Sequence, residues 1–175
     1  GRALLGQGPV LYRGKVGPAR QALARAGIRP MRFSYKEGIS LINGTTLMTG
    51  AAALVLEDAG ALLEAFLGAA ALSVEALGAS AEPYESWVQR VKGHRGQQFV
   101  AAYLRRLLEG SRAVGSTVEL RRRAQAERQK GRSSEAIQSG YSIRCLPQGI
   151  GPMYDTLENA RAVIEMEANS ANDNP

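Results

Sequence analysis

The residues with the clearest chemical potential lie in two polar stretches, each set within apolar, helix-forming sequence. The first, 36–45, reads KEGISLINGT and places an Asn43-Gly44 step directly before a long apolar segment. An asparagine amide and free backbone N–H groups at the start of a helix suit an anion or a developing negative charge. The simpler interpretation is that Asn43-Gly44 forms a turn and Thr45 caps the helix, and spacing alone favours this simpler interpretation.

The second stretch, 138–145, reads QSGYSIRC and carries an arginine between apolar residues. A buried lone cation is costly, so Arg144 needs a carboxylate or phosphate partner. Tyr141 lies three residues earlier, and one helical turn would place both side chains on the same side. Composition alone leaves two roles open for Arg144: binding of an anionic ligand, or a structural ion pair with Glu165 or Glu167.

Residue sets that define several other enzyme classes are missing from the sequence. It contains no phosphate-binding glycine motif, no nucleophile-elbow motif and no His/Cys cluster with metal-ligand spacing. The chain has one histidine and one cysteine, Cys145, which argues against a zinc site and leaves no internal disulfide. We therefore expect no metal, and the single thiol fits a reducing, cytoplasmic setting.

A long apolar segment must position the first polar stretch. The sequence predicts a helix that begins at Thr45 or Thr46 and runs to about Leu77, with apolar residues nearly all around its axis. Such a helix needs several neighbours, so we expect a large helical bundle and an oligomer. The most apolar window, 39–56, carries four Asn and Thr residues and is followed at once by two acidic residues, which favours a buried core helix over a membrane span.

Other local patterns predict a mainly α chain. A proline in the first turn and Gly27 after the last turn indicate a helix over 18–26, preceded by a hairpin-like segment at 10–14. The apolar period and flanking signals predict three more helices, over 83–91, 97–108 and 150–168. Irregular or extended backbone is expected at 30–35, 36–44, 94–97 and 172–175.

Residues 111–140 form a charged connection, with one exposed helix expected at 118–130. The net charge is +6, and LRRRAQAERQKGR at 120–132 holds a large share of the excess, whereas 55–85 is acidic. This basic arm allows one non-enzymatic interpretation, a helical protein that binds nucleic acid. Binding of that kind would weaken steeply as the salt concentration rises.

Several longer motifs resemble one enzyme family. They are KEGISLINGT, LMTGAAAL, LSVEALGAS, HRGQQFVAAYLRRLLEGS, QSGYSIRCLPQGIGPMYDTL and EMEANSANDNP. In order and spacing they are similar to the central segment of the histidine, phenylalanine and tyrosine ammonia-lyases and the related 2,3-aminomutases, over essentially the whole chain. The resemblance implies a mainly α fold, part of a large helical bundle of the fumarase/aspartase-like type. Residues 1–175 are then the central part of one larger domain.

The resemblance implies elimination of ammonia from an aromatic L-amino acid of the Phe, Tyr or His class, which gives an α,β-unsaturated acid. Family members use 4-methylidene-imidazol-5-one (MIO), an electrophile formed autocatalytically from an internal Ala-Ser-Gly, and a loop tyrosine removes the β-proton. This sequence holds no Ala-Ser-Gly. We therefore expect the electrophile-forming segment and a C-terminal glutamate to lie outside residues 1–175, and the chain alone to be inactive.

Four residues match positions of the family motifs. By this resemblance, Arg144 binds the substrate carboxylate, a task that suits the fork geometry of its guanidinium. Asn43 is a catalytic and substrate-binding residue beside the electrophile. Tyr141 is a catalytic residue that lines the site, and Gln138 is a substrate-binding residue. Family sites combine residues of three subunits of a homotetramer, so Asn43 and Arg144 of one chain can serve different sites.

Two features depart from the family pattern, and two further interpretations stay open. Ser139-Gly140 stands where the family often has Asp-Pro, and the arginine-rich segment at 119–132 is longer than in most histidine ammonia-lyases. The second feature favours the phenylalanine and tyrosine enzymes slightly.

A 2,3-aminomutase, which returns the ammonia to the β-carbon, and an inactive relative without the Ala-Ser-Gly are the alternatives. The resemblance implies no nucleic-acid or membrane partner.

Overall fold

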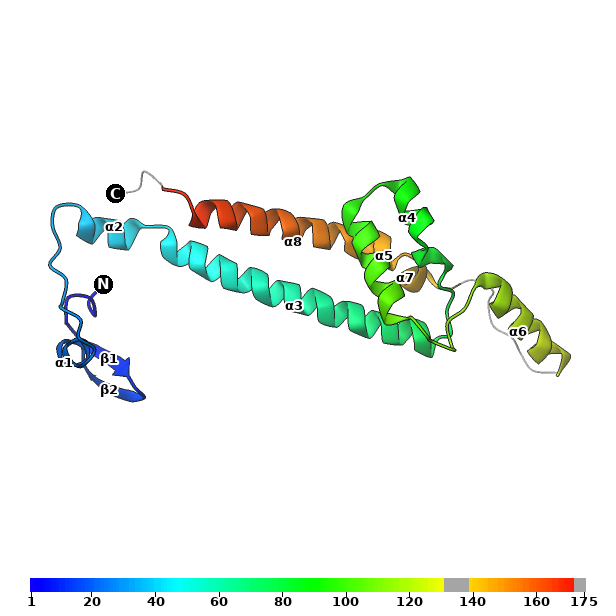
Figure 1. Ribbon diagram of the computed structural model, residues 1–175, viewed down its shortest axis with the longest axis horizontal. Helices are drawn as coiled ribbons and strands as arrows, with labels where there is room; N and C mark the ends of the chain where they lie inside the picture. Colours follow the sequence, from blue (N-terminus) through cyan, green and yellow to red (C-terminus); the bar gives the residue numbers. More distant parts are fainter. Residues whose placement is uncertain (131–138, 172–175) are drawn as a thin grey trace. The chain divides into compact units, whose positions relative to one another are not determined.

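The computed structural model describes residues 1–130 and 139–171 (Figure 1). The chain is mainly helical, which confirms the predicted class. Its residues divide into two compact units, one formed by 1–51 together with the C-terminal residues from 167, and the other by 52–166. Gln138 and the loop predicted at 172–175 lie outside the described residues.

A β-hairpin opens the first unit. Strands β1 (Pro9–Tyr12) and β2 (Lys15–Pro18) pair antiparallel, from Pro9 opposite Pro18 to Tyr12 opposite Lys15. Arg13 and Gly14 connect the strands with positive φ angles of 48° and 76°. Two consecutive residues with positive φ are typical of the tight turn whose twist matches that of the flanking strands. The hairpin predicted at 10–14 is confirmed.

Helix α1 (Ala19–Arg25) follows the hairpin directly. Ala19 is buried, and its backbone N–H donates to the Gly8 carbonyl at 2.8 Å. The helix ends as predicted at Gly27, whose φ is 71°. The backbone N–H of Ile28 reaches back to the Leu23 carbonyl at 2.9 Å, which completes a Schellman motif.

Helix α2 (Glu37–Asn43) corrects the expectation of irregular backbone at 36–44. Local hydrogen bonds favour the helix: the Glu37 carboxylate accepts from the Ser34 N–H at 2.6 Å, and the Ser40 hydroxyl donates to the Lys36 carbonyl at 3.0 Å. One interior glycine costs a helix only about 1 kcal/mol. The two glycines of this stretch are therefore too weak a signal to exclude a helix.

Helix α3 (Thr46–Ala76) agrees with the long helix predicted from Thr45 or Thr46 to Leu77. It ends at Gly78, whose φ is 54°, with a backbone hydrogen bond of 3.0 Å from Ala79 to the Val74 carbonyl. The boundary between the two units falls within this helix, between residues 51 and 52. Only its C-terminal part contributes buried residues: Leu67, Ala70, Ala71 and Val74.

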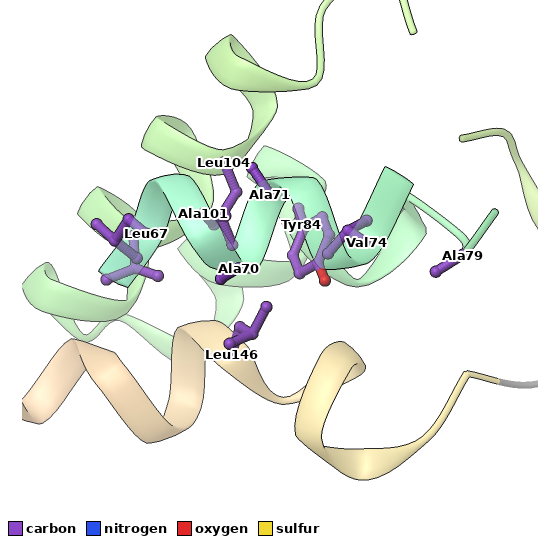
Figure 2. Packing of buried hydrophobic residues seen from close by; sticks show 10 residues of the cluster. Leu67, Ala70, Ala71, Val74, Ala79, Tyr84, Ala101, Leu104 and Leu146 are labelled. Atoms are coloured by element: carbon purple, nitrogen blue, oxygen red, sulfur yellow. The ribbon is translucent and has the colours of Figure 1, made fainter. Parts of the chain in front are cut away.

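The second unit holds the hydrophobic core (Figure 2). Its remaining elements are the 3-10 turn η1 (Glu82–Tyr84) and the helices α4 (Ser86–Lys92), α5 (Arg95–Leu107), α6 (Thr117–Gln129), α7 (Tyr141–Arg144) and α8 (Leu146–Ala168, whose last two residues belong to the first unit). Figure 2 shows α3, α5 and the start of α8 contributing side chains to one cluster. The buried members of this cluster are Leu67, Ala70, Ala71, Val74, Ala79, Tyr84, Val100, Ala101, Leu104 and Leu146.

Most predicted helices of this unit are confirmed, with shifted ends. The helix expected over 83–91 is divided into η1 and α4, and the exposed helix expected at 118–130 is α6. The turn expected at 94–97 is wrong, because α5 already begins at Arg95. The helix expected from residue 150 begins at Leu146.

Helices α5 and α8 touch through two glycines. A Cβ atom added to Gly96 would overlap the Gly151 carbonyl and lie 2.7 Å from its carbon. A Cβ added to Gly151 would lie 2.5 Å from the backbone nitrogen of Gln97 and 2.9 Å from the Gly96 carbonyl carbon. Atoms that are not bonded cannot approach so closely, so glycine at both positions permits this backbone contact. The role of Gly96 is therefore in packing, not in the turn that the sequence predicts.

Much of α3 is exposed within this chain. Its exposed apolar residues are Leu47, Met48, Leu54, Val55, Leu62, Phe66 and Leu72. The helical stretch 37–76 is also long and apolar enough to cross a membrane, by length and composition only, and an 18-residue window within it has a mean hydropathy of 1.6. The chain by itself therefore leaves apolar surface uncovered, as expected for an apolar helix that needs several neighbours. Burial of α3 in an assembly stays a prediction.

Candidate active site

Helix α7 brings two of the four candidate residues together. It is a single turn, Tyr141–Arg144, and the guanidinium carbon of Arg144 lies 4.0 Å from the centroid of the Tyr141 ring. This is the geometry of a cation–π contact. The prediction that one helical turn places both side chains on the same side is confirmed. Tyr141 is exposed and Arg144 half-buried.

Arg144 lines a cleft of about 820 Å³ within the second unit. The cleft combines acidic, basic, hydroxyl and apolar side chains. The other lining residues are Ser80, Glu82, Pro83, Glu85, Trp87, Val88, Thr117, Arg121 and Ser139. A guanidinium in a cleft of mixed character can bind a carboxylate while an apolar wall contacts the rest of the ligand.

A structural ion pair of Arg144 with Glu165 or Glu167 is not supported. Among the described residues, no carboxylate lies within 4.0 Å of its guanidinium. Glu165 is nineteen residues along α8 from Leu146, about 28 Å at the rise of an α-helix, far beyond the reach of an arginine side chain. Glu167 belongs to the first unit, where it accepts a hydrogen bond from the Thr45 hydroxyl at 3.3 Å. A half-buried arginine of this kind suits a carboxylate brought by a ligand.

The backbone of α7 is tied to the core by Tyr84. The Tyr84 phenol donates to the Ile143 carbonyl at 2.7 Å, and the tyrosine is fully buried. Ile143 packs against the hydrophobic cluster, and Leu146 after it is buried. The residue next to Arg144 is therefore fixed both by packing and by a hydrogen bond.

Burial, followed by the neighbouring Cys145 thiol, raises the pKa of Tyr84 to about 12. In the unfolded chain the phenol loses its proton near pH 10, and in the folded chain only near pH 12. The protonated phenol therefore stabilises the fold fully below pH 10, and this stabilisation is lost as the pH rises from 10 to 12.

We expect Tyr84→Phe to remove this source of alkaline destabilisation. The difference between pKa values of about 10 and 12 corresponds to about 2–3 kcal/mol of unfolding free energy. Denaturant unfolding at pH 9 and pH 11.5 measures it: wild type should lose more stability over this interval than the variant. Equal losses in both proteins would contradict the buried, protonated state of the phenol.

A network of hydroxyl groups and a carboxylate forms part of the lining of the cleft. The Glu82 carboxylate accepts from the backbone N–H of Thr117 at 3.0 Å and also from its hydroxyl. The Ser80 hydroxyl lies 3.2 Å from the Thr117 hydroxyl. Helix α6 begins here with a capping box between Ser116 and Glu119, and the hydrogen bonds from Ser116 lower the pKa of the Glu119 carboxyl. These contacts fix the start of α6 beside the cleft.

Asn43 lies in the first unit, as the last residue of α2 and three residues before α3 begins. The step to Gly44 is sterically required, because a Cβ at Gly44 would lie 2.7 Å from the Ser40 carbonyl oxygen. Asn43 therefore ends one helix and lies shortly before another, in the polar segment that the sequence places before the long apolar helix. Asn43 is exposed in this chain.

No local sequence pattern predicts the contacts that hold α7 and line the cleft around Arg144. Tyr84 lies in the polar segment EPYES, where neither its burial nor its bond to residue 143 leaves a local signal. Glu82, which lines the same cleft, likewise bonds to a residue thirty-five positions later, Thr117. Contacts over such separations are set by the tertiary fold and could be found only from the structure.

The sequence profile of aromatic amino acid lyases matches residues 1–175. This chain belongs to the aromatic amino acid lyase family. It is 39% identical over 177 residues to the tyrosine 2,3-aminomutase of Chondromyces crocatus, covering 99% of this chain and 33% of the relative. It is 39% identical over 172 residues to the histidine ammonia-lyase of Sorangium cellulosum, covering 98% of this chain and 31% of that enzyme.

The fold agrees with that of solved family members. The structure of Pantoea agglomerans phenylalanine aminomutase superposes with a TM-score of 0.86 at 37% identity, over 99% of this chain and 34% of that protein. The chain thus spans about a third of the length of the aromatic amino acid lyases and aminomutases that it matches. The family resemblance inferred from the motifs is confirmed.

Proposed function

We propose that the protein containing this chain eliminates ammonia from an aromatic L-amino acid and releases an α,β-unsaturated acid. Family membership supports this carbon–nitrogen lyase activity. The observation that carries the role of this chain is Arg144, half-buried in a cleft, in contact with the Tyr141 ring and without a carboxylate among the described residues at ion-pair distance. The substrate supplies that carboxylate.

The guanidinium holds the substrate through two parallel N–H···O hydrogen bonds. Such bidentate pairing fixes the plane of the carboxylate, and therefore also the direction of the Cα–N and Cβ–H bonds that break. The guanidinium carbon lies over the Tyr141 ring, and this contact limits the movement of the guanidinium. We further propose that the Tyr141 hydroxyl, the Asn43 amide and Gln138 supply the remaining hydrogen bonds around the substrate.

The family is of the MIO type. A guanidinium, a phenol and an amide, which different subunits can contribute to one site, are chemically suited to an electrophile and a carboxylate. When present, MIO supplies the electrophilic centre that activates the substrate for loss of its amine. Asn43 and Tyr141 are the residues of this chain that we propose beside it.

A 2,3-aminomutase is the second candidate, because relatives named aminomutase are as similar to this chain as those named ammonia-lyase. The two reactions share the same substrate-binding residues and differ in how long a closed site retains the intermediate. Incubation of the whole protein with L-Phe, L-Tyr and L-His, followed by chromatography of the products, distinguishes them. Free unsaturated acid supports the lyase, a β-amino acid supports the aminomutase, and neither product from any substrate would contradict both.

We also propose a cytoplasmic homo-oligomer, a tetramer with shared sites, without a nucleic-acid or membrane partner. The support for an oligomer is an apolar groove of about 580 Å³ between α3 and α8, within the second unit. Its lining residues are Ala59, Leu62, Leu63, Phe66, Ile150, Pro152, Met153, Thr156 and Leu157. An apolar surface of this kind is typical of a subunit interface.

We expect Leu62→Glu to weaken assembly of the whole protein, because it places a charge on this apolar surface. Leu62 is exposed within the chain, so the substitution should leave the monomer fold intact. Light scattering after size exclusion measures the mass, with Glu57→Gln on the same helix as the control. A monomeric wild-type protein, or an unchanged mass in Leu62→Glu, would contradict the role of this surface.

A further inference from the structure

We propose that Tyr84 is a positioning residue for Arg144: its buried phenol fixes the helical turn that carries the arginine and so sets the affinity for the substrate carboxylate. This inference rests on the proposed function and extends it to a residue outside the family motifs. Tyr84 itself does not touch the substrate. It acts through the backbone of α7.

Helix α7 is too short to be stable without contacts from the rest of the fold. A helix of four residues has a single turn, and the first turn of a helix is unfavourable without outside contacts. Its carbonyl groups also need partners, because the last carbonyls of a helix have none within it. The Tyr84 phenol supplies one, at 2.7 Å from the Ile143 oxygen, and Ile143 immediately precedes Arg144. A shift of this carbonyl therefore shifts the arginine.

The donor itself is rigidly held. A chain of buried amides connects α5 to the turn that carries Tyr84: Gln97 donates to Gln89 at 2.7 Å, and Gln89 donates to the Pro83 carbonyl at 2.6 Å. Arg105 donates to the carbonyl of Tyr84. Both glutamines are buried, and none of their buried side-chain atoms lacks a hydrogen-bond partner. Fixed partners make such networks stiff, so the phenol holds α7 against an anchored core.

Replacement of Tyr84 by phenylalanine removes the hydroxyl and keeps the ring. The ring still fills its place in the core, but the Ile143 carbonyl loses the hydrogen bond from the phenol and keeps only the local one from the Cys145 N–H, so it can shift. That movement changes the direction of α7, and the displaced guanidinium no longer has the best geometry for two hydrogen bonds to a carboxylate. The affinity for a carboxylate should fall, whereas the chemistry of the bound substrate should change less.

The test is Tyr84→Phe in the whole protein, with kcat and KM for its aromatic amino acid and the inhibition constant of the unsaturated acid product. We expect KM and the inhibition constant to rise about two- to tenfold, the range of one hydrogen bond, with a smaller change in kcat. Tyr154→Phe is the control, because the described contact of Tyr154 is the stacking of its ring on Phe99 at 3.9 Å. This control should leave both constants unchanged.

A double variant separates positioning from a general loss of stability. If Tyr84 acts through Arg144, Tyr84→Phe should raise the inhibition constant much less in the Arg144→Lys background than it does in the wild-type protein. Equal effects in both backgrounds, or a lower melting temperature with unchanged constants, would overturn the positioning role and leave the proposed function intact. If Arg144→Lys itself leaves the constants unchanged, the proposed role of Arg144 fails first.

Discussion

Alanine in place of Gly96 or Gly151 should destabilise the protein strongly for the addition of a single methyl group. Each Cβ would meet backbone atoms of the opposite helix, 2.9 Å away or closer. Backbone cannot rotate out of the way as a side chain can, so α5 and α8 must separate and uncover the core beside them. Overpacking in a dense interior costs about 1–3 kcal/mol and more where backbone is involved. We expect a melting temperature several degrees below wild type and a lower yield of folded protein.

Gly60→Ala is the matched control for this prediction. Gly60 lies within α3 and also faces α8, but its added Cβ would meet the guanidinium end of Arg161. The Arg161 side chain is 46% exposed, so it can rotate into solvent. Alanine also favours a helix over glycine by about 1 kcal/mol. We expect this variant to melt at or above the wild-type temperature. If the Gly96 and Gly60 variants melt alike, the close contact of α5 with α8 is wrong.

Arg144→Lys should lower kcat/KM about tenfold to a hundredfold while the protein keeps its melting temperature. Lysine preserves the charge but not the two-pronged geometry, and loss of one charge-assisted hydrogen bond costs about 1.5–3 kcal/mol. Lysine also loses the contact of the guanidinium with the Tyr141 ring, whose centroid lies 4.0 Å from the guanidinium carbon. Both effects reduce the precision with which the carboxylate is held.

The control for this variant is Arg161→Lys. Arg161 is a half-exposed arginine of the same unit, paired with Glu158 at 3.2 Å, and exposed ion pairs contribute little to stability. Its replacement should change neither efficiency nor melting temperature. A destabilised Arg144→Lys protein with near-normal kcat/KM at low temperature would instead indicate a structural arginine.

Local signals predict much of the fold. Gly27 ends α1 as predicted, because a glycine after the last turn of a helix acts over four or five residues. One failure comes from a glycine whose role is not local. The sequence around Gly96 predicts a turn, although this glycine lies inside the first turn of α5 and meets α8. A single sequence cannot distinguish a glycine that bends the chain from one that admits a neighbouring helix.

The candidate site is predictable to a similar degree. The spacing of Tyr141 and Arg144 predicts their contact, because a single helical turn suffices to bring them together. The ion pair of Arg144 with Glu165 is an equally plausible interpretation of the sequence, and only the length of α8 removes it. Tyr84 is not predictable, because its hydrogen bond crosses fifty-nine positions of the chain.

The exposed apolar face of α3 is a further feature that depends on contacts outside the local sequence, here with other subunits of the proposed oligomer. The sequence indicates a helix that is apolar on most sides, and the structure leaves Leu54, Val55 and Leu62 uncovered within one chain. The hydrophobic effect favours removal of such surface from water. The sequence of one helix does not indicate which surface covers these residues. It therefore predicts that α3 needs a neighbour, but not which neighbour.

The most direct test of carboxylate binding by Arg144 compares an aromatic amino acid with its carboxamide in wild type and in Arg144→Lys. The carboxamide keeps the ring, the amine and the β-carbon but has neither the charge nor the two equivalent oxygens that a guanidinium fork binds. We predict that wild type strongly prefers the acid, measured as the ratio of the two kcat/KM values, and that this preference falls at least about tenfold in the variant. The same ratio in both proteins would show that Arg144 does not bind the substrate carboxylate.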